Sequence, residues 1–289
     1  MALILALRSP EIDVLAITVV AGNVPLERCV RNAAGLVGLL GAQTPVAAGA
    51  GKPLLRETVV AEVHGADGVG GASALLPAGP PVLPQPAPAV ILDAAGRYPG
   101  DVMLVALGPL TNVAAAALAD PARFAKLTGI VSMGGAFQVP GNATAVAEFN
   151  VFADPHAASV VLASGVPVTF VGLDVTTKVC LSGGLLSATA PPVKDPVWTF
   201  VEKAAMHFLE SSRSYGCHLH DPLAVGVVID PSLVETRRVF VEVETSGHAT
   251  LGMTVTDLRA WSTRAPNAKV CVGVHAERFL ELFAARVLR

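Results

Sequence analysis

The chain has 289 residues, and its 20 basic and 23 acidic side chains form no single-sign stripe, which argues against a nucleic-acid partner. Its hydrophobic fraction of 52% and mean hydropathy of +0.58 are high, but Gly, Pro, Asn or charge interrupts the apolar runs before the roughly 18 residues of a membrane-spanning helix. The four cysteines lie far apart with no Cys-x-x-Cys pair, which argues against a zinc site or a disulfide framework and favours a reducing cytoplasm.

Short apolar runs alternate with helical patterns along most of the chain, as is typical of βα units around a buried parallel sheet. The apolar runs predict strands at 13–21, 44–47, 102–106, 129–133 and 166–171. The segments between them predict helices at 26–40, 89–98, 110–119 and 155–164. We therefore expect an α/β fold, Rossmann-like, with an open and mostly parallel sheet flanked by helices, in a single domain over residues 1–289.

Prolines shape two of the remaining segments. Six prolines between Pro77 and Pro88 predict an extended surface loop, because proline cannot donate to a hydrogen-bond ladder. A second proline-broken stretch precedes a predicted helix at 197–215. The last third of the chain predicts strands at 239–243, 250–255 and 270–274 and a closing helix at 276–286.

The beginning of the chain is unusual for this fold class. Residues 1–7 have the pattern of the middle of a helix, yet no N-cap, acidic first turn or strand precedes them. They also lack the basic residues that open a secretory signal. Because a doubly wound sheet normally opens with a strand that helps to build the ligand crevice, we expect the first strand to be missing and the natural protein to begin upstream of Met1. The genomic sequence upstream of Met1 tests this expectation.

Polar residues cluster just after the predicted strands, where open α/β sheets bind ligands. Asn23 follows the first strand and is either a site residue or a cap of the helix that starts near Pro25. His64 lies in a glycine-rich loop, and the segment 107–112 follows another strand. Each of these is only a turn when taken alone, and a lone histidine in such a loop more often faces solvent.

The segment after the strand at 129–133 carries three side chains that bind hydroxyls well: Asn142, Glu148 and Asn150. Glu148 and Asn150 are two residues apart, so in an extended segment they point to the same side. A carboxylate and an amide there can hold two sugar hydroxyls. The alternative, a surface loop of mixed polarity, leaves the apolar neighbours at 146, 149, 151 and 152 unexplained.

His220, Asp221 and Pro222 precede the apolar run 223–229. Asp221 can cap that run, since proline favours the first helical turn. The adjacent His220 is the side-chain type that offers a proton near neutral pH without a strongly perturbed pKa. This pairing of an acid with a carboxylate is typical of a catalytic site.

Taken in order, these motifs resemble the inosine-uridine nucleoside hydrolase family. The resemblance rests on Val-Ala-Gly-Asn ending at Asn23, His-Gly-Ala-Asp-Gly from His64, and the segments 107–112, 133–137, 148–154 and 217–222. It covers nearly the whole chain. It implies an enzyme of purine or pyrimidine salvage that splits ribonucleosides into base and ribose, works as a homodimer or homotetramer, and holds Ca²⁺ tightly at the bottom of its pocket.

The resemblance also implies roles for individual residues. It makes Asp221 a calcium ligand and the Leu107 carbonyl a second one, as suits a hard cation. His220 faces the base as leaving-group acid, while a metal-bound water attacks through an oxocarbenium-like transition state. The remaining implied contacts are to the substrate. The resemblance implies that the ribose hydroxyls bind to Asn142, Glu148 and Asn150 and that Met133 lines the sugar pocket. It also implies that Asn23 supports the site and that His64 lies on the base side.

One family motif has no match here. The family opens with Asp-x-Asp-Pro-Gly-x-Asp-Asp, which supplies the general base and most calcium carboxylates. With one carboxylate ligand left, calcium affinity should collapse. A second interpretation is therefore a catalytically inactive nucleoside- or ribose-binding protein that lacks the metal site. A Rossmann-type dehydrogenase has less support, because no Gly-x-Gly-x-x-Gly follows the first strand.

Base preference stays open in the sequence. His220 favours the inosine-uridine or pyrimidine-directed branches of the family. The candidate base contacts lie in the segment just before His220, at Arg213, Tyr215 or His218.

Overall fold

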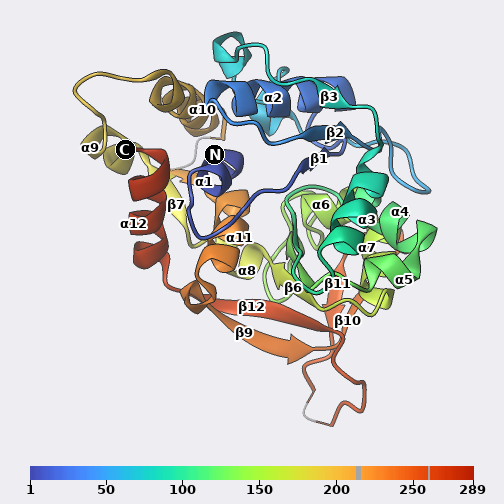
Figure 1. The fold of residues 1–289 in the computed structure, drawn as a ribbon. Coiled ribbons are helices and arrows are strands. Elements are labelled where there is room, and N and C mark those ends of the chain that lie inside the picture. Colours follow the sequence, from blue (N-terminus) through green and yellow to red (C-terminus); the bar gives the residue numbers. More distant parts are fainter. Residues whose placement is uncertain (213–215, 260) are drawn as a thin grey trace.

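A computed structural model describes residues 1–212, 216–259 and 261–289, and its centre is a five-stranded sheet (Figure 1). Four of its strands run parallel, and the fifth, an edge strand, is antiparallel to its neighbour. The predicted open, mostly parallel sheet is thus confirmed. In spatial order the strands are β4 (Met103–Ala106), β5 (Gly129–Met133), β6 (Val168–Val171), β12 (Ala268–Val274) and β9 (Val234–Val239).

Three smaller sheets surround the central one. A parallel sheet consists of β1 (Ile17–Val19), β2 (Val46–Ala48) and β3 (Val82–Leu83). Two antiparallel pairs consist of β7 (Cys180–Ser182) with β8 (Gly216–His218), and of β10 (Val241–Val243) with β11 (Thr254–Thr256).

Helices cover both faces of the central sheet. Alternate residues of β5 face opposite sides, so Ile130 packs in one hydrophobic cluster and Val131 in the other. The Ile130 side contains α3 (Ala87–Arg97), α4 (Thr111–Ala119), α5 (Pro121–Phe124) and α7 (Pro155–Ala163). The Val131 side contains α1 (Ala2–Leu7), α8 (Leu173–Thr176), α9 (Gly183–Ala188), α10 (Pro196–Ser212), α11 (His220–Ile229) and α12 (Ala276–Val287).

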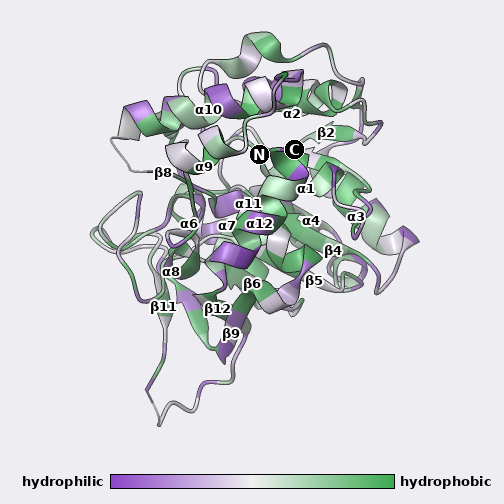
Figure 2. Cartoon of the chain, turned by 90° about the vertical axis from the view of Figure 1, so that its left-hand side faces the viewer, coloured by the Kyte–Doolittle hydropathy of each residue, from purple (hydrophilic) through white to green (hydrophobic). Residues whose placement is uncertain are grey.

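The central strands form because their residues are apolar on both faces. All five residues of β5 are buried, which is the pattern of a parallel strand covered on both sides. In Figure 2 the inner strands are mostly green, whereas β9 at the sheet edge is purple. The charged residues of that strand, Glu235, Arg237 and Arg238, are exposed, and charge at an edge discourages pairing with another sheet. Within the described residues, no helix is long and apolar enough to cross a membrane.

A buried asparagine joins the small parallel sheet to the central one. Asn112, in the first turn of α4, donates from Nδ2 to the Val19 carbonyl at 3.0 Å and accepts at Oδ1 from the Ala50 N–H at 2.7 Å. Its side chain is 4% exposed, so both ends of the amide are satisfied away from water. Asn112 therefore fixes the carboxyl ends of β1 and β2 beside the carboxyl end of β4.

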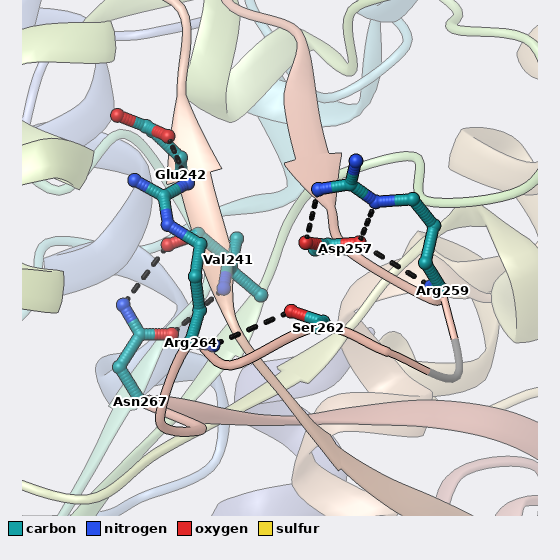
Figure 3. A network of polar contacts seen from close by, with 7 residues as sticks. All are labelled: Val241, Glu242, Asp257, Arg259, Ser262, Arg264 and Asn267. Carbon is teal, nitrogen blue, oxygen red and sulfur yellow. Dashed lines mark hydrogen bonds and ion pairs between the residues drawn. The ribbon is translucent and has the colours of Figure 1, made fainter.

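Polar side chains in the segment between β11 and β12 tie it to the β10–β11 hairpin (Figure 3). Asn267 donates to the Val241 carbonyl and accepts from the Val241 N–H, at 2.9 and 2.8 Å. Arg264 pairs with Glu242 at 2.6 Å and lies over the Phe240 ring. These contacts give Val241 the two hydrogen bonds that a neighbouring strand residue would give.

Several predicted elements differ from the structure. The strand expected at 13–21 shortens to Ile17–Val19, and the one expected at 250–255 starts only at Thr254 because a turn precedes it. The proline-rich segment is not wholly a loop: Val82–Leu83 forms β3, since the prolines around these two residues leave their own N–H groups free to pair. Strand β9 and the short helix α6 (Phe149–Ala153) were not predicted at all.

Asp154 fastens the helical layer around the site. It is fully buried and accepts from the Ala157 N–H at the start of α7, from Thr111 Oγ1 and from the Leu54 N–H, at 3.0, 2.7 and 2.9 Å. We expect Asp154→Ala to lower the free energy of unfolding by about 3 kcal/mol, because it leaves three buried donors without an acceptor. Urea denaturation measures this loss.

The matched control is Asp120→Ala. Asp120 also caps a helix that begins with proline, but it is half exposed and accepts only the Arg123 N–H as a cap. We expect a loss of about 1 kcal/mol there. Equal losses in the two variants would contradict the role assigned to the bonds from Leu54 and Thr111.

Candidate active site

The sequence-predicted site residues surround one cavity of about 570 Å³, a volume typical of small-molecule sites. The cavity lies at the carboxyl ends of β4 and β5, where this fold class binds ligands. The cavity lies after the strands of the sheet, as the sequence predicted. The role of each residue in it is still a prediction. All nine of the predicted site residues are among those that line it: Asn23, His64, Leu107, Met133, Asn142, Glu148, Asn150, His220 and Asp221.

Glu148 is buried, at 2% exposure, and not part of a surface loop. Its Oε1 accepts from the Asn150 N–H at 2.8 Å, and its Oε2 accepts from the Val151 and Gly135 N–H groups at 3.1 Å. It therefore caps α6 and ties that helix to the turn after β5. Burial raises the pKa of Glu148, and the three N–H bonds oppose that rise. One of its roughly four lone-pair sites is left for a ligand hydroxyl.

Asn150 lies in α6, so the extended segment predicted for Glu148 and Asn150 is wrong. Both side chains still line the cavity, because Glu148 keeps an extended backbone as N-cap and Asn150 follows in the first turn. Asn150 Nδ2 donates to the Met133 carbonyl at 3.0 Å and to the Leu107 carbonyl at 3.3 Å. It thereby links the ends of β4 and β5 and holds its carboxamide at the floor of the cavity.

Two asparagines stand at other parts of the cavity. Asn142 is exposed and accepts from the Phe149 N–H at 2.8 Å, which fastens its loop to the start of α6. Asn23 lines the cavity from the small parallel sheet. The alternative role of Asn23 as a helix cap is wrong, since α2 (Leu26–Leu39) begins after Pro25 without a side-chain cap.

Asp221 lies in the first turn of α11, and its predicted role as a cap is also wrong because that helix starts without a side-chain cap. Burial raises the pKa of Asp221 to about 7, opposed by the nearby Met1 ammonium and reinforced by Glu148. The same burial lowers the pKa of the Met1 amino group, which Asp221 opposes. Asp221 and Met1 both line the cavity.

His220 sits beside Asp221 and is oriented by a threonine. Its Nδ1 lies 2.7 Å from Thr176 Oγ1, and Thr176 is fully buried at the end of α8. Burial lowers the pKa of His220 to about 4, and His218 and His64 add to this effect. The ring of His218 is 5.4 Å from that of His220. In the ligand-free cavity His220 is therefore a neutral imidazole at pH 7.

One face of α10 forms a wall of the cavity that the sequence analysis missed. Phe200, Ala204, His207 and Phe208 all line it, and the His64 ring lies 6.3 Å from that of Phe208. Their spacing of three and four residues is the helical signal that could have indicated a shared face. Thr176 was missed because it follows β6 by only a few residues, in a segment that sequence patterns assign to no element.

Two of the three candidate base contacts, Arg213 and Tyr215, lie outside the described residues. The third, His218, lines the cavity, and its Nδ1 is buried without a partner among the described residues.

The donors at this cavity do not by themselves fit a calcium ion. Calcium takes about six to eight oxygen ligands. The resemblance assigns two here, Asp221 and the Leu107 carbonyl, and that carbonyl already accepts from Asn150. In the part of the chain that the structure describes, no three His, Cys, Asp or Glu side chains are grouped to hold a metal. A calcium ion here needs oxygen donors beyond these two.

Solved structures with this fold are nucleoside hydrolases. The purine-preferring ribonucleoside hydrolase of Gardnerella vaginalis superposes with a TM-score of 0.90 at 33% identity, over 99% of this chain and 93% of that one. The plant nucleoside hydrolase PpNRh1 superposes with a TM-score of 0.88 at 33% identity, over 99% and 94%. The fold is therefore that of the nucleoside hydrolases.

The sequence relatives give the family. Residues 1–281 match the family described as inosine-uridine preferring nucleoside hydrolase. The pyrimidine-specific ribonucleoside hydrolases RihA of Salmonella arizonae and of Citrobacter koseri are each 41% identical to this chain, over 99% of it and 93% of the relative. The chain belongs to the inosine-uridine preferring nucleoside hydrolase family.

Proposed function

We propose that this protein hydrolyses pyrimidine ribonucleosides to free base and ribose in the cavity at the ends of β4 and β5. The observation that carries the proposal is the convergence of Glu148, Asn150, Asp221 and His220 on that one cavity. The pyrimidine preference is supported by the relatives at 41% identity, which are named pyrimidine-specific.

The ribose hydroxyls bind at the α6 end of the cavity. Glu148 accepts a hydroxyl with the lone pair that its three N–H partners leave over. Asn150 spends its amide protons on the Leu107 and Met133 carbonyls, so its Oδ1 serves as an acceptor. Both groups are held before substrate arrives, and preorganised contacts that tighten as positive charge develops on the ribose lower the barrier.

The base leaves on the histidine side. Water forms a bond to the anomeric carbon and releases one proton to solvent. The bond from that carbon to the base nitrogen breaks, and its electron pair goes to the base, which takes up a proton. We assign the delivery of that proton to His220. To act as the acid, His220 takes up a proton from solvent to form the imidazolium, donates it from Nε2 to the base and returns to the neutral imidazole, while Nδ1 stays 2.7 Å from the Thr176 hydroxyl.

Calcium stays a proposal for this protein. Asp221 and the Leu107 carbonyl would hold it, and when bound it would supply Lewis-acid activation of water. Its support is the resemblance and the hard oxygen character of these two donors. Because two donors fall short of a full shell, tight binding by this chain alone is not expected.

The test measures ribose release and base formation from uridine and from inosine, with added calcium and with a chelator. We expect faster release from uridine, and calcium dependence only at a high calcium concentration, because two donors bind the ion weakly. Preference for inosine would contradict the pyrimidine assignment. Equal release under both conditions would contradict the calcium proposal.

A second candidate is an inactive protein that binds ribonucleosides or ribose. Among the described residues, no three His, Cys, Asp or Glu side chains are grouped around Asp221 to hold a metal, which favours this alternative. Calorimetry with uridine separates the two: binding without ribose release under either condition supports the inactive protein.

The cytoplasmic location is proposed on the scattered cysteines, and the homodimer or homotetramer is proposed on the family resemblance. Sedimentation equilibrium of the purified chain tests the assembly, with a monomer as the outcome that contradicts it.

A further inference from the structure

The segment 64–73, here called the His64 loop, is wrapped around one carboxylate. Asp67 accepts from the N–H groups of Val69, Gly71 and Ser73, at 3.1, 2.9 and 3.1 Å. Burial alone would raise the pKa of Asp67, but these hydrogen bonds outweigh it and lower the pKa to about 2. Asp67 is therefore ionised near neutral pH, and its carboxylate stabilises the loop by accepting these three backbone hydrogen bonds.

Helix α2 holds the His64 loop from one side. Asn32, which is 9% exposed, donates from Nδ2 to the Asp67 carbonyl at 2.8 Å. Arg28 donates to the Ala66 carbonyl. Both contacts lie within three residues of His64, so the loop cannot shift without breaking them.

Helix α10 holds the loop from the other side. Gly70 has a φ of +65°, and a Cβ there would lie 2.8 Å from the Cβ of His207. Only glycine allows this backbone conformation and this approach at once. The Gly70 N–H also donates to the His64 carbonyl at 2.9 Å, which closes the loop. The turn around Asp67 thus sets both ends of the segment that presents His64.

His64 is the loop residue that reaches the site. Its ring lines the cavity next to Phe208, and burial, His207 and the Met1 ammonium together lower its pKa. Asp67 itself is absent from the residues that line this cavity. Any influence of Asp67 on the substrate therefore passes through the loop.

We propose that Asp67 is a positioning residue that holds His64 against the base side of the cavity. The proposal rests on the function proposed above and on the family resemblance, which places His64 on the base side of the cavity. It assigns a role to the fourth residue of the His-Gly-Ala-Asp-Gly motif.

A double-mutant cycle on Asp67→Asn and His64→Ala tests the proposal. The amide of Asp67→Asn keeps the size of the side chain but points a donor at backbone donors. We expect KM for uridine to rise about tenfold with kcat changed much less, since a base contact is lost from both ground and transition states. In the His64→Ala background the same substitution should leave KM unchanged. Equal effects in the two backgrounds would overturn the proposal.

Two further measurements keep the test decisive. Asp101→Asn, at an exposed turn, is the control and should match wild type. If Asp67→Asn is too unstable for kinetics, Asn32→Ala removes one bond to the same loop and takes its place in the cycle.

An NMR titration of the histidines separates this proposal from the proposed function. In Asp67→Asn the pKa of His64 should move back toward its ordinary value, as the ring leaves its buried place beside His207. An unchanged His64 titration would overturn the positioning role, whether or not the protein releases ribose. Absence of ribose release from wild type would count against the proposed function alone, and the Kd for uridine then replaces KM in the cycle.

Discussion

Replacing Glu148 with alanine should lower the free energy of unfolding by about 3 kcal/mol and abolish ribonucleoside binding. The side chain is buried and accepts three backbone N–H bonds, from Gly135, Asn150 and Val151. Alanine leaves those donors unpaired and removes the acceptor proposed for the ribose. Urea denaturation measures the stability, and calorimetry with uridine measures the binding.

Two other variants sharpen this prediction. Glu148→Gln preserves the shape but turns an amide toward backbone donors, so we expect a smaller loss of stability and weak binding. Glu202→Ala removes an exposed carboxylate paired with Lys194 and should cost about 0.5 kcal/mol or less. Normal uridine affinity in Glu148→Ala would contradict the site as described.

Replacing Asp221 with asparagine should stabilise the metal-free protein at pH 8 while abolishing ribose release. Burial raises the pKa of Asp221 to about 7, because the ionised carboxylate is less stable inside the protein than in water. At pH 8 the ionised group therefore lowers the free energy of unfolding. Asparagine fills nearly the same space without a charge. Functional groups that destabilise a fold in this way are a recognised cost of an active site.

The direction of the pH effect follows from the two pKa values of Asp221. Below the unfolded value of 3.8, both states are protonated and the group has no effect. Between 3.8 and about 7 the unfolded state loses its proton first, so folding loses about 1.4 kcal/mol for each pH unit. The advantage of Asp221→Asn should therefore be absent near pH 4, grow as pH rises, and level off above pH 7 at a few kcal/mol.

Asp174→Asn is the matched control for that pH series. Asp174 is also buried, but it accepts from the Phe137 and Gln138 N–H groups at 2.9 and 2.8 Å. Its loss should destabilise the fold at pH 8, where Asp221→Asn is expected to stabilise it. A stability gain for Asp221→Asn that is the same at pH 4 and at pH 8 would contradict the buried-carboxyl interpretation.

The strands were predictable where burial on both faces leaves a continuous apolar run. Gly129–Met133 was predicted residue for residue, and the helix at Pro155–Ala163 was predicted with one residue too many. Strand β9 was not, because its exposed Glu235, Arg237 and Arg238 hide the pattern at a sheet edge. Strand β3 was missed because its pairing to β2 is a tertiary contact that the surrounding prolines mask.

The residues of the candidate site could be predicted from the sequence, but their arrangement in space could not. Motif order indicated Glu148, Asn150 and Asp221, and the structure places all three around one cavity. The helix that contains Asn150 was missed because its cap is a glutamate, which lies outside the usual capping residues. The α10 wall with His207 and the Thr176 contact to His220 depend on chain segments far apart in sequence.

The junction at Asn112 has a consequence for how a ligand acts on the whole molecule. Asn23 follows β1 and Asn150 bonds to the carbonyls of Leu107 and Met133, so residues on both sides of that junction line the cavity, and at the junction the Asn112 carboxamide bonds to the ends of β1 and β2. A nucleoside that contacts residues on both sides of the cavity would stabilise the junction at Asn112. Amide protons of β1 and β2, remote from the bond that breaks, should then exchange more slowly with solvent deuterium when the cavity is filled.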